Sequence, residues 1–494
     1  MTFRRLVPYL TFLAIVAMAI RPSIDTDTWW HLRAGEWILD HRQILREDVF
    51  SLTMTGAAWA YPGWLAEIVM ASIQRLAGLS ALSIFTTAFV IVGLAFVWPL
   101  LEGPLLLRAV VLLLAAATSA IYWSARPQIL SFALTGATLY LIDRAVPPRP
   151  AFAWVLPAML ALWANVHGGF AIGLILVGAA FLGEGFETLV GDPARGIPLR
   201  DSWLARRRRL LWLAGLAAAS ALAVGLNPFG LSMLAYPWKT VSIGVLQASI
   251  QEWQSPDFHS AAVQPFLVML VGLLVSVAAS RRPMTAVEAI RTAAFTAMAL
   301  LAARNIASFA LVAAPTLARH LASAVDRWPW MLPKSRPLPE AVTRPVNLLL
   351  AILLTVGVGA WSSLELDSET IGRHIDRQIP RQAFEQLALE HPPGNLFHSY
   401  NWGGYVLWRL YPDYPSFVDG RTDVFSAQVL DEYQEAWAAR PGWEAVLDKY
   451  NIDNVLVEPV APLVQTLTLS GWIETYRDDQ AVLLRRPRLL KGAG

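Results

Sequence analysis

Two acidic residues, Asp25 and Asp27, lie two positions apart in the segment DTDTWWH, shortly after an apolar N-terminal stretch. Carboxylate oxygens at this spacing suit a divalent cation such as Mg²⁺ or Mn²⁺ beside a phosphate, and one carboxylate could serve as a general base. A structural explanation also fits, in which an Asp caps the following helix and the tryptophans anchor it at a membrane surface. We predict Asp25 and Asp27 as catalytic or metal-binding residues, with His31 as a further candidate.

Two arginines, Arg126 and Arg304, each adjoin a long apolar stretch. A guanidinium group is always charged and forms paired hydrogen bonds with phosphate, so both residues suit the binding of a phosphorylated donor. The alternative is that both side chains extend toward lipid headgroups. We predict Arg126 and Arg304 as phosphate-binding residues and Asn305, beside Arg304, as a further site candidate.

The segment WANVHGG at residues 163–169 interrupts an apolar pattern with polar residues and two glycines. Glycines allow a ligand to approach the backbone closely. His167 could be a ligand or an acid–base group, and a structural hydrogen bond is the alternative. We predict Asn165 and His167 as site candidates.

Asp419 and Arg421 flank a glycine in the segment VDGRTD. These polar groups on a turn could close over a sugar or an acceptor. A structural turn with a local ion pair explains them equally well. Both residues are therefore site candidates with two interpretations left open.

The composition requires a lipid environment for most of the chain. Of its 494 residues, 55% are hydrophobic and only 15% are charged, whereas soluble domains carry roughly 25% charged residues. The chain has no cysteine, which excludes disulfides, thiolate metal sites and cysteine nucleophiles. The net charge of +2 does not indicate a partner, and we expect no nucleic acid.

Eleven apolar stretches approach the length of about 20 residues that a membrane helix needs. We predict a polytopic α-helical membrane protein with about eleven transmembrane helices. Their approximate bounds are 6–20, 79–101, 108–122, 127–142, 150–164, 168–187, 210–226, 261–280, 284–303, 306–321 and 346–364.

Basic residues between these stretches predict a retained first span with the N-terminus inside, because cytoplasmic loops are rich in arginine and lysine. This topology places the polar site candidates of residues 25–31, 126, 165–167 and 304–305 at the outer face. No glycine or proline marks a turn near Arg304, and a single crossing by residues 284–321 would put the C-terminus inside. We predict two crossings because that stretch is too long for one.

The chain therefore divides into a membrane domain, residues 1–365, and a soluble α/β tail, residues 366–494. Residues 21–78 form a first external loop within the membrane domain. The tail is long enough to bury its own core. It contains β-rich runs at 454–457 and 481–484.

In its layout the chain resembles the GT-C superfamily, integral-membrane glycosyltransferases that use polyprenyl-linked sugars. The segment DTWWHLR at 27–33 is closest to the first-loop motif of oligosaccharyltransferase catalytic subunits. The segment YNWGGY at 400–405 resembles their acceptor-binding motif but lacks its acid, and it makes Trp402 a site candidate. The segments WANVHGG and VDGR resemble uncharacterised bacterial GT-C-like proteins.

The resemblance implies transfer of a sugar from a polyprenyl-phosphate donor to an unknown acceptor at the outer face of the bacterial cytoplasmic membrane. Asp27 would take the place of the family's catalytic or metal-binding Asp, and Mg²⁺ or Mn²⁺ would be the cofactor. The alternatives are a non-catalytic scaffold of envelope assembly and a protein that binds or transports a lipid-linked glycan.

Overall fold

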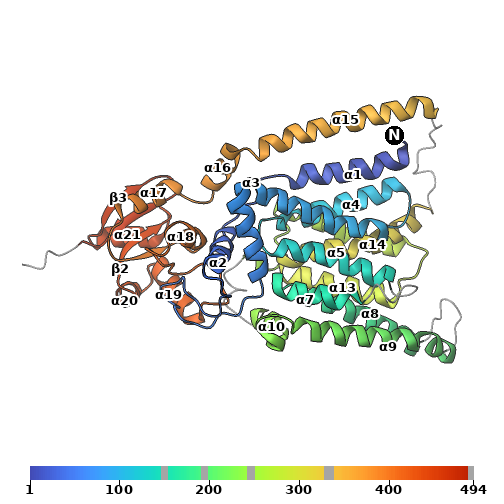
Figure 1. The fold of residues 1–494 in the computed structure, drawn as a ribbon, viewed down its shortest axis with the longest axis horizontal. Coiled ribbons are helices and arrows are strands. Elements are labelled where there is room, and N and C mark those ends of the chain that lie inside the picture. The colour runs from blue at the N-terminus through green and yellow to red at the C-terminus, as the bar shows by residue number, and fades with distance from the viewer. Residues whose placement is uncertain (146–153, 191–198, 242–250, 327–338, 488–494) are drawn as a thin grey trace, which may run out of the picture. The chain divides into compact units, whose positions relative to one another are not determined.

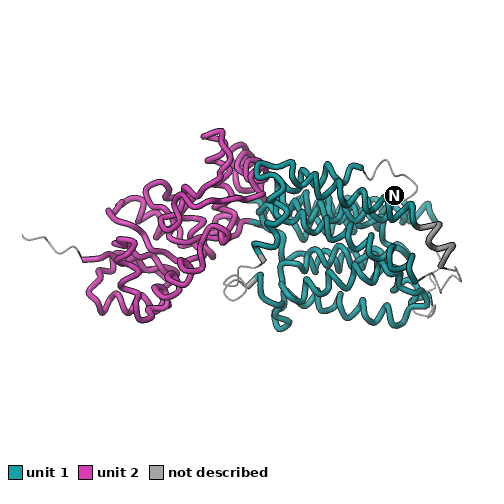
Figure 2. The backbone as a smooth tube through the Cα atoms, turned by 90° about the horizontal axis from the view of Figure 1, so that it is seen from below, with its two compact units in different colours: residues 1–23, 83–241, 247–367 teal, residues 24–82, 242–246, 368–494 magenta. Residues whose placement is uncertain are grey.

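Each of the eleven predicted apolar stretches coincides with a helix in the computed structural model (Figure 1). The structure describes residues 1–145, 154–190, 199–241, 251–326 and 339–487, so the beginning of the predicted span 150–164 lies outside the described residues. The chain divides into two units (Figure 2). Unit 1 comprises residues 1–23, 83–241 and 247–367, and unit 2 comprises residues 24–82, 242–246 and 368–494.

Unit 1 is a helical bundle. Its long helices are α1 (Phe3–Ala19), the later part of α3 (Trp64–Val97), α4 (Leu105–Ser119), α5 (Gln128–Ala145), α7 (Val155–Val166), α8 (Phe170–Val190), α9 (Leu199–Val224), α12 (Gln264–Ala279), α13 (Ala286–Leu301), α14 (Ile306–Val325) and α15 (Glu340–Glu365). Its short elements are η1 (Trp98–Leu100), η2 (Ala120–Tyr122), η3 (Gly230–Ala235), α10 (Tyr236–Val241), η4 (Gln251–Trp253), η5 (Ala261–Val263) and η6 (Ala303–Asn305).

Six helical stretches among the described residues are long and apolar enough to cross a membrane. They are Trp64–Leu100, Leu105–Tyr122, Phe170–Val190, Ala261–Ala279, Ala303–Val325 and Glu340–Glu365. The polytopic helical membrane fold is thereby confirmed, whereas the number of eleven crossings stays a prediction.

Helix α14 occupies the core of unit 1. It packs against α4, α5, α12 and α13. Of its most apolar stretch of 18 residues, 83% is buried. Small residues such as Ala310 and Ala314, both fully buried, allow neighbouring helices to approach closely. In contrast, only 6% of the most apolar 18-residue stretch of α15 is buried, as expected for a helix that faces lipid.

The stretch 284–321 forms two helices, α13 and α14, and that both cross the membrane stays a prediction. Helix α13 ends at Leu301, and Ala302 has an extended backbone with φ −147° and ψ 121°. The side-chain amide of Asn305 donates to the carbonyl oxygen of Met298 at 3.0 Å and so satisfies a group at the end of α13. Helices α13 and α14 then pack against each other.

Unit 2 combines helices with a small mixed sheet. Its helical elements are α2 (Thr28–His41), the start of α3, α16 (Ser368–Asp376), α17 (Arg381–Glu390), η8 (Tyr400–Trp402), α18 (Gly403–Arg409), α19 (Ala427–Trp437), α20 (Trp443–Lys449) and α21 (Pro462–Leu469). Its strands are β1 (Asn395–His398), β2 (Ile452–Val457), β3 (Ile473–Arg477) and β4 (Val482–Arg485).

The strand order of this sheet is β1-β2-β4-β3, with β1 parallel to β2 and the other pairs antiparallel. The register places Val455 opposite Leu484 and Val457 opposite Val482. All four side chains are fully buried, because this pair of strands lies at the centre of the sheet. The two β-rich runs predicted from the sequence correspond to β2 and β4.

The first loop and the tail share one hydrophobic core. Trp30, Phe50 and Trp59 from the loop belong to the same buried cluster as Phe417 and Val455 from the tail. Backbone pairing extends this contact, because Leu52 N–H donates to the carbonyl of Ser416 at 2.8 Å. Residues 24–82 thus group with residues 368–494, whereas the sequence analysis assigned the loop to the membrane domain. The loop's apolar side chains are buried where the tail completes their core.

Candidate functional site

Asp25 makes the hydrogen bonds expected of a helix cap. Its Oδ1 accepts from the backbone N–H of Asp27 at 3.1 Å and from the N–H and hydroxyl of Thr28 at 3.0 and 3.1 Å. The Thr28 Oγ1 in turn accepts from the N–H of Asp25 at 3.0 Å. Asp25 therefore fixes the conformation of residues 25–28 where α2 begins, in agreement with the capping interpretation.

Asp27 occupies the N-cap position of α2 but makes no side-chain cap hydrogen bond. Its half-buried carboxylate lies against the glycine of the VDGR turn. A Cβ added to Gly420 would stand 2.0 Å from Asp27 Oδ1 and 2.8 Å from Trp30 Nε1. The acid that the resemblance implies to be catalytic or metal-binding is thus in close contact with a tail motif.

His31 is held by an acid that the sequence analysis did not identify. Its Nδ1 lies 3.0 Å from Glu67 Oε1, and both side chains are buried. The imidazole also lies against the ring of Trp30, with 3.5 Å between centroids. These contacts fix the ring of His31 inside unit 2.

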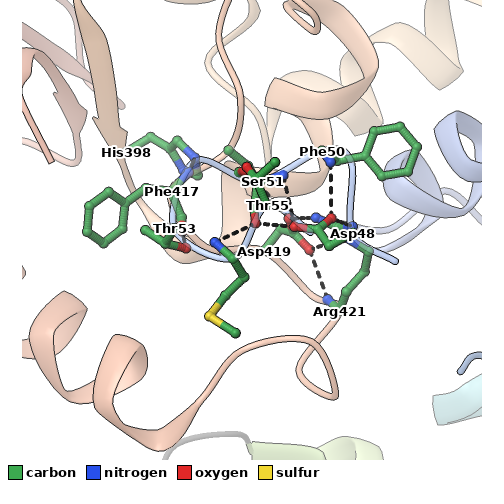
Figure 3. A network of polar contacts seen from close by, with 11 residues as sticks. Asp48, Phe50, Ser51, Thr53, Thr55, His398, Phe417, Asp419 and Arg421 are labelled. Atoms are coloured by element: carbon green, nitrogen blue, oxygen red, sulfur yellow. Dashed lines mark hydrogen bonds and ion pairs between the residues drawn. The ribbon is translucent and has the colours of Figure 1, made fainter. Parts of the chain in front are cut away.

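Asp419 and Arg421 form a fully buried ion-pair network with Asp48 of the first loop (Figure 3). Arg421 Nη1 donates to Asp48 Oδ1 at 2.5 Å, and Arg421 Nε and Nη2 donate to the two oxygens of Asp419 at 2.8 Å. Asp48 also accepts from the N–H groups of Phe50 and Ser51, at 3.0 and 3.2 Å.

The charges of this network stabilise one another. Burial alone would raise the pKa of Asp419, but the charge of Arg421 and the hydrogen bonds from Arg421 and Ser416 outweigh it and hold the pKa below its usual value. Neither the Asp419 nor the Arg421 side chain has exposed surface. Of the two interpretations left open, this geometry supports the structural turn with an ion pair.

The YNWGGY motif packs between the acid segment and the VDGR turn. Trp402 is buried and its Nε1 donates to the carbonyl of Gln378 at 3.2 Å. A Cβ on Gly403 would stand 2.2 Å from the carbonyl oxygen of Val418, and one on Gly404 would stand 2.6 Å from that of Thr26. The two glycines therefore let the backbone of this motif lie directly against the backbone at Val418 and Thr26. The hydrogen bond from Trp402 stabilises the motif.

In unit 1 the site candidates Arg126, Arg304 and His167 lie together. We call these three residues, with Glu252 and Trp253 that contact the arginines, the arginine cluster. Arg126 Nη1 lies 3.6 Å from Glu252 Oε2, and the guanidinium carbon of Arg304 lies 4.0 Å from the centroid of the Trp253 ring. The N–H of Ala303 donates to the carbonyl of Gln254 at 2.9 Å. One short segment thus contacts both arginines.

His167 in this cluster is held as a single neutral tautomer. Its Nδ1 accepts from the N–H of Gly169 at 3.0 Å and lies 2.7 Å from Ser131 Oγ, which itself accepts from Trp163 Nε1 at 2.6 Å. Because Nδ1 accepts, the ring proton is on Nε2. Burial, together with the charges of Arg304 and Arg126, lowers the pKa of His167 to about 3, so the ring is a neutral donor at physiological pH.

Two other candidates connect helix ends. The side-chain amide of Asn165 donates to the carbonyls of Ala161 and Leu226, both at 2.8 Å, and so joins α7 to the end of α9. Asn305 makes the equivalent bond at the end of α13. The structure thus brings Arg126, Arg304 and His167 together and gives the two asparagines structural contacts.

The sequence analysis missed several residues that hold these groups. Nothing in the local sequence pattern distinguishes these residues, because their partners lie far away in the chain. The missed residues are Asp48, Glu67, Ser131, Trp253 and Gly420.

Asp25 and Asp27 were also predicted as ligands of Mg²⁺ or Mn²⁺. Among the described residues, no three or more His, Asp or Glu side chains are grouped to hold a metal ion. Oδ1 of Asp25 already accepts three hydrogen bonds. Mg²⁺ commonly binds through one or two carboxylates, with water and substrate phosphate as its other ligands. Asp25 Oδ1 is thus committed to the helix cap, and the binding of Mg²⁺ or Mn²⁺ by the two carboxylates stays a prediction.

No protein-family model matches the chain, and no curated protein matches it by sequence. The archaeal oligosaccharyltransferase AglB from Archaeoglobus fulgidus, solved with an inhibitory peptide and a dolichol-phosphate, matches at a TM-score of 0.51. That match has 13% sequence identity and covers 92% of this chain and 70% of AglB.

Two other solved structures match at lower TM-scores. ArnT from Cupriavidus metallidurans has 14% identity, a TM-score of 0.46 and 97% coverage of both chains. The mycobacterial arabinofuranosyltransferase AftD has 16% identity and a TM-score of 0.44, with coverage of 98% of this chain and 42% of AftD. All three are GT-C superfamily membrane glycosyltransferases. The match to AglB confirms the predicted GT-C-like fold.

Proposed function

We propose that this protein transfers a sugar from a polyprenyl-phosphate-linked donor to an acceptor at the outer face of the bacterial cytoplasmic membrane. The observation that carries the proposal is the arginine cluster, in which three donors suited to phosphate, Arg126, Arg304 and the Nε2–H of His167, lie in a bundle of apolar helices. Guanidinium groups bind phosphate through charge-assisted hydrogen bonds, and a polyprenyl chain requires an apolar surface.

In this mechanism Arg126 and Arg304 bind the donor phosphate and stabilise the negative charge that develops on it as the sugar leaves. The loss of one such preorganised donor costs about 10²- to 10³-fold in kcat. His167 adds an uncharged donor whose tautomer is fixed by Ser131 and Gly169.

Asp27 removes the proton from the acceptor hydroxyl as that oxygen attacks the sugar. Asp25 fixes the backbone on which Asp27 lies. A Mg²⁺ or Mn²⁺ ion bound by the two carboxylates would supply further stabilisation of phosphate charge.

The test is turnover of a panel of polyprenyl-phosphate sugars by the purified protein in nanodiscs, with and without Mg²⁺ or Mn²⁺. We expect Asp27→Asn to lower kcat by about 10²- to 10⁴-fold, since the general base is lost. Arg126→Gln and Arg304→Gln should each lower it by about 10²- to 10³-fold.

Matched controls are Asp413→Asn, whose side chain is 60% exposed, and Arg282→Gln, whose side chain is 48% exposed and paired with Glu102. Both should keep wild-type turnover. If no donor is consumed, or if wild type and Asp27→Asn consume it equally, the enzymatic proposal is wrong. A scaffold or a protein that binds or transports a lipid-linked glycan then becomes the better explanation.

A further inference from the structure

Position 420 requires a glycine because the Asp27 carboxylate lies too close to leave room for a Cβ. Its φ is not among the positive values found at other glycines of the chain. A Cβ at this position would stand 2.0 Å from Oδ1 and 3.0 Å from Cγ of Asp27. A Cβ does not approach another heavy atom to 2.0 Å, so any side chain here would displace the Asp27 carboxylate.

The turn that carries Gly420 is firmly held. Arg421 and Asp419 on either side of it are completely buried in the ion-pair network with Asp48. The N–H of Arg421 donates to Asp419 Oδ1 at 3.0 Å, and the N–H of Thr422 donates to the carbonyl of Gly420 at 2.9 Å. Breaking a buried ion pair costs several kcal/mol. A clash at Gly420 is therefore relieved by the Asp27 side chain rather than by the turn.

A second polar atom lies at the same point. Trp30 Nε1 stands 2.8 Å from the Cβ position of Gly420 and has no hydrogen-bond partner among the described residues, although Trp30 is only 5% exposed. Asp27 and Trp30 are three residues apart at the start of α2, which places them on one side of the helix. The face of Gly420 thus contacts both the carboxylate and the indole.

We propose that Gly420 is a positioning residue that sets the location of the Asp27 carboxylate for glycosyl transfer. This inference rests on the proposed function of Asp27. The VDGR turn of the tail is the surface against which the acid is placed, and the Arg421 network keeps this surface rigid. The tail motif contributes to the reaction through Asp27 and need not touch the donor or the acceptor.

The test is Gly420→Ala in the full-length protein in nanodiscs. We expect kcat to fall about 10- to 100-fold while the KM for the donor changes less than threefold, because the donor phosphate is bound by other residues. The melting temperature should stay within about 3 °C of wild type, since the atoms that must shift are the end of the Asp27 side chain and the edge of the Trp30 ring. Gly372→Ala in α16 is the matched control, because its nearest neighbour, Arg381 Nη2, would lie at 3.4 Å; it should change neither quantity.

A second measurement reports on the carboxylate without turnover. The rates at which a water-soluble carbodiimide modifies Asp27 and Asp25 are measured by mass spectrometry in wild type and Gly420→Ala. We expect at least a threefold change at Asp27 and no change at Asp25, whose Oδ1 remains in the helix cap.

The outcomes separate this inference from the proposed function. Wild-type kcat in Gly420→Ala overturns the inference and leaves the glycosyltransferase proposal intact. An unchanged modification rate at Asp27, or a loss of more than about 5 °C in melting temperature, also overturns it, because the carboxylate has not moved or the turn itself has. If wild type consumes no donor but the rate of Asp27 modification differs between wild type and Gly420→Ala, the proposed function is wrong and the positioning contact stands.

Discussion

His398 in unit 2 has hydrogen bonds that only a neutral imidazole can make. Its Nε2 accepts from the N–H of Phe417 at 2.9 Å, and its Nδ1 lies 3.0 Å from the carbonyl oxygen of Ser399, to which it donates. His398 ends β1, and its side chain is fully buried against the segment before the VDGR turn. Burial lowers the pKa of His398 to about 4. A proton on Nε2 would remove the acceptor that Phe417 uses.

This geometry predicts that unit 2 loses stability in mild acid. The unfolded chain binds a proton on His398 near its ordinary pKa of about 6.5, whereas the folded chain binds it only near pH 4. The free energy of unfolding is therefore undiminished above pH 6.5 and falls as the pH decreases toward 4. The loss between pH 7 and pH 5 should be about 2 kcal/mol.

The measurement is the melting temperature of the full-length protein at pH 7 and pH 5, compared with that of His398→Asn. The asparagine amide can donate and accept as the neutral ring does but does not titrate. Its melting temperature should therefore depend less on pH. Equal pH dependence in both proteins would contradict the assignment to His398.

At the scale of elements, α14 combines a membrane-spanning length with small side chains on the surfaces that face its neighbours. Ala314 has no exposed surface and lies where several helices meet. Ala360 on α15 is exposed. The two alanines therefore differ in surroundings but both lie within long apolar helices.

We predict that Ala314→Leu destabilises the protein by about 1–3 kcal/mol, because added methylene groups in a close-packed core force neighbouring helices apart. Ala360→Leu should leave stability nearly unchanged. The melting temperatures and size-exclusion profiles of both variants in detergent test this prediction. Equal effects would show that α14 is not the packed centre of unit 1.

The helices could be predicted from the sequence because the length of an apolar run is a local property. The break at Ala302 was harder to place, since no glycine or proline marks it. It is defined by the extended backbone of Ala302 and the amide of Asn305, and both are visible only in the structure.

At the scale of the whole molecule, the core of unit 2 is assembled from two distant parts of the chain, the first loop and the tail. Trp59 of the first loop is 2% exposed and lies in the core that also contains β2 and β4 of the tail. The loop and the tail should therefore unfold together.

We predict that Trp59→Ala increases hydrogen exchange in the tail as well as in the loop. A Trp-to-Ala change in a core costs about 3–5 kcal/mol. Peptides covering β2 and β4 should exchange faster, as measured by mass spectrometry on the full-length protein. Trp361→Ala on α15, where the side chain is 48% exposed, is the control. If faster exchange is confined to residues 24–63, the loop folds independently of the tail.

This organisation could not be predicted from the sequence. Asp48 and Arg421 are separated by 373 positions. The sequence around either residue does not indicate that the other is its partner. The same reason explains why the acids and arginines were selected as site candidates while Glu67, Ser131 and Gly420 were missed. The first group is unusual by residue type beside apolar stretches, whereas the second is defined by its neighbours in space.

The two-part core of unit 2 has a consequence for biosynthesis. The 285 residues from 83 to 367 are translated between the first loop and the tail that form this core. At 5–20 residues per second, this takes on the order of 15–60 s. During that interval Phe50 and Trp59 lack the partners that bury them, so the nascent loop is a candidate substrate for chaperones and proteases. A chain truncated before residue 368 lacks Gly420, against which the Asp27 carboxylate lies. Residues translated after the helical bundle therefore complete the surroundings of residues translated before it.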